Sequence, residues 1–321
     1  MPKIVIIGVS HIAHFHIMAL RKAGLEPIAI ASSNLNSSSI EDFAKKNNIL
    51  KYYLDWKKML NDESFDGIVI VSRIESTIEI LSEAIRYEVP LFVEKPAGFH
   101  SNSLKEIIKN GHDKILVGYN RRFYKTVKNV KELVKGKESV LVTMTAPEAP
   151  TIRKFFDNTS HSIDLLHFLF GDIKVEFTKR IISEGNLIGV IAIFSTKQNN
   201  IIQFTGNWGA SDNFSLITYL RKKKLELKPF EELNIFEEMD IIEPTDESPI
   251  RKYIPKKIET IKLDDIDGEI KPGFFQQATE FLQMINTNSP PIIGSTLLDA
   301  QKTLEICEEL VGIIEEADIE K

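Results

Sequence analysis

The sequence has very little cysteine: its one thiol in 321 residues is Cys307. A single cysteine cannot form an intrachain disulfide or build a cysteine-rich zinc site. We expect no metal among the site residues. The chain also lacks any apolar run near the about 20 residues that a membrane span needs. Its first residues, Met1-Pro2-Lys3, show no signal-peptide pattern. These absences predict a cytoplasmic protein without a membrane partner.

The chain has no excess of positive charge either. Its 40 basic and 46 acidic residues give a formal net charge of −6, and the basic residues are scattered. Nucleic-acid-binding proteins usually concentrate Lys and Arg on one face, so we expect no nucleic-acid partner. The length, together with a hydrophobic fraction of 43%, is sufficient for two domains with their own cores.

Residues 1–119 alternate short apolar runs with helical patterns. The expected strands cover residues 4–7, 27–31, 67–71, 91–93 and 115–117. The expected helices cover residues 12–23, 38–47, 76–87 and 101–110. The runs are apolar on consecutive positions, which is typical of parallel strands buried on both faces. The alternation predicts an α/β domain with a doubly wound parallel sheet.

Residues 120–321 have a different pattern. Strand-like stretches follow one another at residues 140–145, 174–182, 187–196, 201–208, 214–220 and 224–228. Helices are expected at residues 123–135, 159–170, 273–286 and 296–317. This order predicts an α+β domain with a large, mostly antiparallel sheet. Residues 229–262 mix acidic, basic and proline residues, and we expect a long irregular excursion there.

A nucleotide-binding turn is expected after the first strand, in the segment Gly8-Val9-Ser10-His11-Ile12-Ala13. The dinucleotide motif G-x-G-x-x-G/A lies between a strand and a helix, and this segment keeps only its first glycine and the final alanine. Ser10 is small enough for the backbone to approach a pyrophosphate at the helix N-terminus. Gly8, Ser10, His11, Ile12 and Ala13 are therefore candidate cofactor ligands, and a turn without a nucleotide is the alternative.

The choice of cofactor is expected to depend on the residues after the second strand. An acidic residue there would bind the ribose 2′-hydroxyl of NAD. The chain instead has Ser32-Ser33-Asn34, which brings no carboxylate to repel a 2′-phosphate, so NADP is favoured over NAD. Ser72, directly after the strand 67–71, is a further candidate ligand.

The tripeptide Glu94-Lys95-Pro96 follows the strand 91–93. Parallel strands deliver their carboxyl ends to the ligand crevice, so Lys95 is a candidate for polarising a substrate oxygen. Pro96 fixes the turn, and Glu94 is expected to support the loop or bind the cofactor. The alternative is a surface lysine in a strand-to-helix loop.

A second polar group is expected at the start of the helix 159–170. Asp157 precedes His161 by four residues, close enough to orient the imidazole and tune its pKa for proton transfer. The alternative is a capping aspartate beside a structural histidine.

Taken together, these motifs resemble the glucose–fructose oxidoreductase / inositol dehydrogenase (Gfo/Idh/MocA) family. The resemblance rests on the Gly8 turn, Glu94-Lys95-Pro96, the run Tyr119-Asn120-Arg121-Arg122-Phe123, and Asp157 with His161 and Asp164. The family's histidine extension is matched by Ala13-His14-Phe15-His16, with alanine in place of glycine. The resemblance covers nearly the whole chain.

The resemblance implies a Rossmann domain over 1–119 and a substrate-binding and oligomerisation domain over 120–321. It implies NAD(P)-dependent oxidation or reduction of a sugar, cyclitol or related compound, with Lys95, Asp157 and His161 as the catalytic and substrate-binding group. Either Lys95 or His161 would transfer the proton. Tyr119 and Arg122 are expected as further substrate ligands, and a salt bridge that ties the two domains together is the alternative for the arginine.

Two other functions remain open for a relative of this family. One is a non-catalytic regulator that binds the dinucleotide, and the other is a glycoside-cleaving enzyme with tightly held NAD. The resemblance also implies a homodimer or homotetramer formed through the C-terminal sheet.

Overall fold

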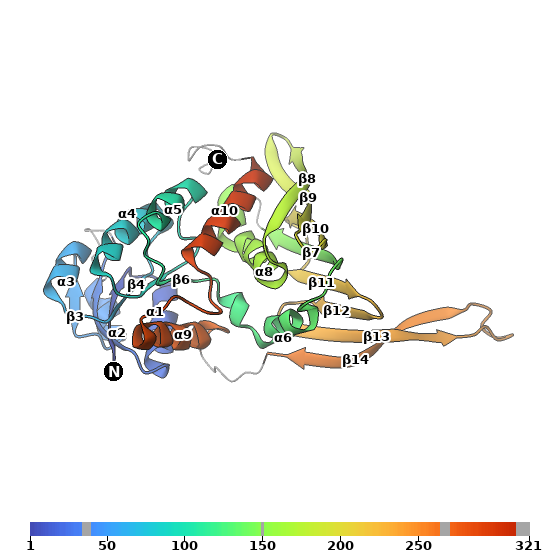
Figure 1. Cartoon of the computed structure of the whole chain (residues 1–321), viewed down its shortest axis with the longest axis horizontal. Coiled ribbons are helices and arrows are strands. Elements are labelled where there is room, and N and C mark those ends of the chain that lie inside the picture. The colour runs from blue at the N-terminus through green and yellow to red at the C-terminus, as the bar shows by residue number, and fades with distance from the viewer. Residues whose placement is uncertain (34–39, 149–150, 264–269, 313–321) are drawn as a thin grey trace. The chain divides into compact units, whose positions relative to one another are not determined.

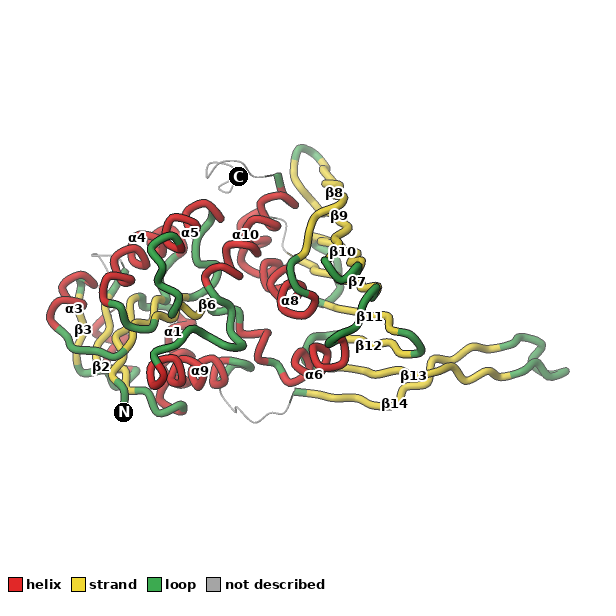
Figure 2. The backbone as a smooth tube through the Cα atoms, in the orientation of Figure 1, coloured by secondary structure: helices red, strands yellow, loops and turns green. Residues whose placement is uncertain are grey.

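A computed structural model describes residues 1–33, 40–148, 151–263 and 270–312 (Figures 1 and 2). The chain forms two compact units. The first comprises Met1–Phe123 with the closing helices α9 and α10, and the second runs from Tyr124 through the last strand, β14. The expected second domain, 120–321, therefore differs from the second compact unit, because the closing helices pack with the first.

The first unit contains a six-stranded parallel sheet in the order β3-β2-β1-β4-β5-β6. The strands are β1 (Lys3–Ile7), β2 (Glu26–Ala31), β3 (Lys51–Tyr53), β4 (Gly67–Ile70), β5 (Leu91–Val93) and β6 (Ile115–Val117). The strand order reverses between β1 and β4, which makes that point the ligand crevice of a doubly wound sheet. The predicted fold class is confirmed for this unit.

Helices cover this sheet in two layers (Figure 1). The helices are α1 (His11–Lys22), α2 (Ile40–Lys46), α3 (Trp56–Asp62), α4 (Ile74–Ala84), α5 (Ser101–Ile108), α9 (Phe274–Thr287) and α10 (Leu297–Val311), with a 3-10 turn, η1, at Ile85–Tyr87. Buried residues of α1, α2 and α9 share one core cluster with the strands, whereas α10 packs against α5. Burial of Phe281 and Met284 in that cluster is the reason that α9 belongs to the first unit.

The second unit contains an eight-stranded sheet in the order β14-β13-β12-β11-β7-β10-β9-β8. Its strands are β7 (Leu141–Glu148), β8 (Ile173–Ser183), β9 (Asn186–Thr196), β10 (Ile201–Trp208), β11 (Ser215–Leu220), β12 (Lys223–Leu227), β13 (Glu232–Ile242) and β14 (Lys252–Lys262). All neighbours are antiparallel except β7 and β10. The expected mostly antiparallel sheet is therefore confirmed.

One face of this sheet is covered and the other is open. Alternate residues such as Met144, Phe204 and Leu225 are fully buried, and the helices α6 (Lys125–Val134) and α8 (Ser160–Phe170) lie on their side (Figure 1). Between β7 and α8 lie a short helical turn, α7 (Ile152–Lys154), and a π-helical turn, η3 (Phe155–Thr159).

The expectation of an irregular excursion at 229–262 is wrong. These residues form β13 and β14, which pair with each other along their length, and Pro255 lies within β14 opposite Met239. Pro255 is tolerated because β14 is the edge strand of the sheet, where a backbone N–H is not needed on the outer side. Within the described residues, no helix has the length and apolar character that a membrane span needs.

Candidate functional site at the strand ends of the first unit

The predicted cofactor residues of the first unit gather at one edge of the parallel sheet. Gly8 follows β1, Ser32 follows β2, Ser72 comes just after β4, and Glu94 follows β5. These strands are neighbours and parallel, so their carboxyl ends meet on the same side. This edge spans the point where the strand order reverses, which is where doubly wound sheets bind ligands.

The turn after β1 requires glycine. Gly8 has φ +121°, a conformation that L side chains rarely adopt, and its N–H donates to the carbonyl of Ala31 at 2.8 Å. A Cβ atom at this position would lie 2.3 Å from the carbonyl oxygen of Val71. The chain therefore passes against the end of β4 at van der Waals distance, and only glycine fits.

The N-terminus of α1 follows this turn directly. Ser10 is the N-cap residue, and its hydroxyl accepts a hydrogen bond from the backbone N–H of Ala13 at 3.3 Å. The N–H groups of His11 and Ile12, in the same turn, have no intrahelical acceptors. They carry the positive end of the helix dipole and form a site suited to a pyrophosphate. The glycine turn and the amides at this helix end fit the dinucleotide that the sequence predicts.

Hydroxyl groups follow β2 and β4. Ser32 is buried and its N–H donates to Tyr53, whereas Ser33 is half-buried. Asn34, the third predicted residue at this turn, lies outside the described residues. The Ser72 and Thr77 hydroxyls lie 2.9 Å apart, and Thr77 also donates to the carbonyl of Arg73 at 3.0 Å. Of the two serines after β2, Ser33 is therefore the one that solvent reaches.

Glu94 is held by a histidine that the site prediction did not include. The Nε2 atom of His16 lies 2.5 Å from Oε1 of Glu94, and Oε2 accepts from the backbone N–H of Lys95 at 3.0 Å. His16 is buried in α1, where its ring stacks on Phe274 at 4.6 Å and meets Phe92 edge-on at 5.0 Å. In the sequence, His16 was marked only as the end of the A-x-x-H extension that begins at Ala13.

The Glu94 carboxylate is ionised in this setting. Burial acts to raise its pKa, but the hydrogen bond and charge of His16, with the nearby charge of Lys95, hold the pKa below its ordinary value. A Cβ atom on Gly118 would lie 3.1 Å from the carboxylate, so a small residue is needed beside it. Both carboxylate oxygens therefore have protein donors, and Glu94 acts as a support for the Lys95 backbone.

Lys95 lies at the carboxyl end of β5 and is half-buried. The β5 end is fixed on both sides, because the N–H of Glu94 donates to Ile70 and the N–H of Gly118 donates to Val93. The peptide bond between Lys95 and Pro96 is cis. The ammonium group is thus carried by a backbone that its neighbours hold in place.

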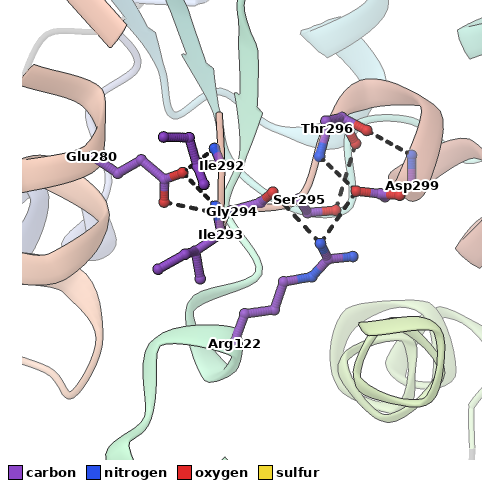
Figure 3. A network of polar contacts seen from close by, with 8 residues as sticks. All are labelled: Arg122, Glu280, Ile292, Ile293, Gly294, Ser295, Thr296 and Asp299. Atoms are coloured by element: carbon purple, nitrogen blue, oxygen red, sulfur yellow. Dashed lines mark hydrogen bonds and ion pairs between the residues drawn. The ribbon is translucent and has the colours of Figure 1, made fainter. Parts of the chain in front are cut away.

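Tyr119 and Arg122 lie beyond β6 and are both buried. The Nη1 atom of Arg122 lies 3.2 Å from Oδ2 of Asp299 and 3.5 Å from the carbonyl of Gly294 (Figure 3). This ion pair is formed within the first unit, so it is not the salt bridge between domains that was the alternative for the arginine. Substrate binding by Tyr119 and Arg122 stays a prediction.

The segment that receives Arg122 is itself fixed by a buried carboxylate. Glu280 accepts hydrogen bonds from the backbone N–H groups of Ile292, Ile293 and Gly294, the last two at 2.7 and 3.0 Å (Figure 3). The next residue, Ser295, accepts from the N–H of Val117 at 2.8 Å. These contacts attach the chain between α9 and α10 to β6, and they fix the position of the residues that follow β6.

The second unit carries Asp157 and His161 on consecutive helical turns. Asp157 lies in η3 and is half-buried, and His161 lies in the first turn of α8 and is buried. A spacing of four residues places two side chains on the same face of a helix. Single π-helical turns are frequent at functional sites. Asp164, one turn further on, is buried as well.

The expected helix at 159–170 is confirmed as α8 (Ser160–Phe170), and the chain before it is helical as well. Thr159 has helical backbone angles and makes no side-chain cap. The cap lies at Thr151, whose hydroxyl accepts from the N–H of Lys154 at 3.1 Å. Upstream, α7 and η3 continue into α8, so Asp157 lies inside a helical segment instead of before one.

Comparisons with known proteins agree with this geometry. Residues 2–120 match the family model described as "Oxidoreductase family, NAD-binding Rossmann fold", GFO_IDH_MocA. The oxidoreductase YrbE of Bacillus subtilis is 28% identical over 182 residues, which cover 52% of this chain and 53% of that protein. Myo-inositol 2-dehydrogenase of Thermotoga maritima is 23% identical over 201 residues, covering 58% and 59%. The chain thus spans between half and three fifths of the length of these relatives.

The fold similarity extends over the whole chain. The myo-inositol dehydrogenase of Lactobacillus casei, solved in complex with NAD(H) and myo-inositol, aligns with a TM-score of 0.72 at 18% identity. The alignment covers 97% of this chain and 94% of that one. At this identity the comparison shows the shared fold.

The parallel sheet, its glycine turn and the helix N-terminus beside it define an NAD-binding Rossmann domain. In residues 2–120 the chain matches the NAD-binding domain of the Gfo/Idh/MocA oxidoreductase family.

Proposed function

We propose that the protein is an NAD(P)-dependent oxidoreductase that acts on the CH–OH group of a sugar, a cyclitol or a related hydroxy or keto compound. The observation that carries the proposal is the placement of Lys95. The lysine lies at the carboxyl end of β5, on the sheet edge that also carries the Gly8 turn, and its backbone N–H donates to the half-buried Glu94. The names of the relatives, which include myo-inositol 2-dehydrogenase, support a polyol substrate.

The residues of the Gly8 turn would hold the cofactor, with the α1 N-terminus binding its pyrophosphate. A nicotinamide dinucleotide bound there supplies the hydride acceptor or donor. The protein must therefore move the hydroxyl proton and stabilise the charge on the reacting oxygen. Removal of a group that does this typically costs about 10²–10⁴-fold in rate.

Lys95 and His161 are the two groups that we propose for this work. The Lys95 ammonium would donate a hydrogen bond to the reacting oxygen and stabilise developing alkoxide charge. His161 would accept or return the hydroxyl proton, with Asp157 orienting its imidazole. The opposite assignment, with Lys95 as the proton-transfer group, predicts a larger loss of turnover from Lys95→Met than from His161→Gln.

We propose NADP as the preferred cofactor. The support is the serine pair after β2, which offers hydroxyl groups and no carboxylate to a 2′-phosphate. Because Ser32 is buried, Ser33 is the hydroxyl that we assign to this contact. Tighter binding of NAD than of NADP by the wild-type protein would reject this assignment.

The test is turnover of purified protein with NAD⁺ and with NADP⁺ over a panel of polyols and sugars that includes myo-inositol, followed by the absorbance of the reduced cofactor. Net reduction that Lys95→Met abolishes supports the proposal. Cofactor binding without turnover of any compound would favour a regulator. Glycoside cleavage without net reduction, with cofactor that copurifies, would favour the glycoside-cleaving alternative.

We further propose that the protein forms a homodimer or homotetramer through the open face of the eight-stranded sheet. This face carries large apolar side chains that remain substantially exposed, among them Leu141, Phe177, Ile191, Ile201 and Tyr219. Contiguous apolar surfaces of this kind mark interaction sites in soluble proteins.

A further inference from the structure

The last two strands of the second unit extend beyond the rest of its sheet. Strand β12 pairs with β13 only between Leu233 and Glu237, whereas the pairing of β13 with β14 continues to Ile242 (Figure 1). We call the part from Glu238 to Pro255 the arm. The arm is a two-stranded ribbon whose turn is closed by its own hydrogen bonds, between Thr245 and Ser248 at 3.0 and 3.1 Å.

An isolated two-stranded ribbon is at best marginally stable in water, because one strand can cover little of the other. The arm nevertheless carries large apolar side chains, and those of Met239, Ile241, Ile242, Ile250, Tyr253 and Ile254 are all exposed. A ribbon of this composition gains stability when another surface covers one of its faces.

The pairing register identifies the face that is apolar on both strands. Met239 lies opposite Pro255, and Ile241 lies opposite Tyr253, so these four residues share one face. The other face pairs Asp240 with Ile254 and Ile242 with Lys252, and it therefore alternates apolar and charged residues. The two faces of the arm thus differ, and only one has a continuous apolar stripe.

This stripe continues the open face of the sheet. Met239 and Pro255 line the same shallow depression as Phe236 and Lys224. Lys224 lies opposite Tyr219 on the open face, and its ammonium sits 4.0 Å from the centre of the Phe236 ring. The apolar surface proposed for self-association therefore meets the arm at this depression, where Lys224 and Phe236 adjoin Met239 and Pro255.

Charges of opposite sign mark the two ends of the stripe. The turn at the arm's end carries Glu243, Asp246, Glu247 and Arg251, for a formal charge of 1 − 3 = −2, and Arg251 is already paired with Glu243 at 2.6 Å. The basic turn Arg221-Lys222-Lys223-Lys224 lies at the arm's base. The N–H of Glu238 donates a hydrogen bond to the carbonyl of Lys222 in this turn at 3.2 Å. Arg221, Lys222, Asp246 and Glu247 are all exposed.

A two-fold contact between identical arms would cover the apolar stripe and bring the opposite charges together. In an isologous contact, residue i of one copy meets residue j of the other and j meets i. Two arms packed face to face and head to tail therefore place the acidic end of each copy at the basic turn of its partner. We propose that the arm docks on a second copy of this chain through the stripe Met239, Ile241, Tyr253 and Pro255, with Asp246 and Glu247 facing the partner's basic turn. The inference rests on the self-association proposed above. It adds that the arm determines how the two copies are aligned.

The arm offers a matched pair of variants, because Ile241 and Ile242 are adjacent, identical in type, and exposed by 53% and 48%. Ile241→Lys places a charge on the stripe, whereas Ile242→Lys places it on the other face. The measurement is sedimentation equilibrium of wild type and both variants over a range of protein concentrations. We expect Ile241→Lys to raise the dissociation constant at least about tenfold, equal to about 1.4 kcal/mol, and Ile242→Lys to leave it unchanged.

Charge reversal checks the register. Lys222→Glu should weaken association, and adding Asp246→Lys in the same chain should restore it in part, with both effects reduced at high salt. Equal dissociation constants for wild type and Ile241→Lys would overturn the arm contact. If Ile241→Lys had no effect but Ile191→Lys dissociated the assembly, the copies would associate through the sheet without the arm. A wild-type protein that stays monomeric would overturn both, and none of these outcomes bears on turnover.

Discussion

Replacing Glu94 with glutamine tests the buried pair that supports Lys95. The carboxylate accepts from His16 through Oε1 at 2.5 Å and from the Lys95 N–H through Oε2 at 3.0 Å. A glutamine amide has one acceptor oxygen, so its NH₂ group would face one of these two donors. Glu94→Gln therefore removes the charge from the hydrogen bonds in this part-buried site, and hydrogen bonds to a charged group contribute about 1.5–3 kcal/mol.

The expected loss is large enough to measure by thermal unfolding. For a unit of this size, 1 kcal/mol shifts the Tm by about 2–4 °C, so Glu94→Gln should lower the Tm by about 3–12 °C. The control is Glu83→Gln, which removes a surface pair with Arg86 at 3.0 Å and should cost less than about 1 kcal/mol. Equal Tm values for the two variants would refute the reasoning.

The same pair predicts a dependence of stability on pH. The pKa of Glu94 is lower in the folded protein than in the unfolded chain, so its ionisation stabilises the fold above the unfolded value of about 4.3. This stabilisation is lost as the pH falls through the folded pKa. The Tm difference between wild type and Glu94→Gln should therefore be full at neutral pH and shrink below about pH 4. A difference that grows on acidification would contradict the sign of the shift.

Three further variants test other parts of the site. Gly8→Ala forces a Cβ against Val71 in a positive-φ conformation, and we expect a loss of dinucleotide affinity of at least about tenfold in a binding titration. Ser33→Asp brings a carboxylate to the turn after β2, and it should lower the affinity for NADP relative to NAD by at least about tenfold; an unchanged ratio would exclude Ser33 from the 2′ contact. Arg122→Ala should lower the Tm through a loss of about 1.5–3 kcal/mol, whereas an unchanged Tm with a raised KM would favour substrate binding.

The sequence predicted the parallel sheet and the antiparallel sheet because their strands are strongly patterned. Runs such as Ile4–Ile7 are apolar on consecutive positions, and strands such as 201–208 alternate. The edge strand β3 was missed because its three residues are mostly exposed, and the helix α3 was missed with it, although Asp55 caps that helix. The strands of the arm were missed because the arm has no covered face, so neither strand shows a regular alternation of buried and exposed positions.

The candidate site, too, could be predicted from the sequence only in part. Gly8, Ser33 and Lys95 follow predicted strands, and the parallel topology alone brings strand ends to one edge. The support of Lys95 could not be predicted, because His16 and Glu94 are 78 residues apart and meet only when α1 packs beside β5. For Glu94 the sequence proposed cofactor binding or loop support, and the structure gives both carboxylate oxygens protein donors.

The most direct test of the central claim is the turnover of wild type and Lys95→Met with a polyol substrate, measured together with cofactor affinity. We expect kcat to fall by about 10²–10⁴-fold while the dissociation constant of the cofactor stays nearly unchanged. A Lys95→Met variant that keeps the wild-type kcat would contradict the account.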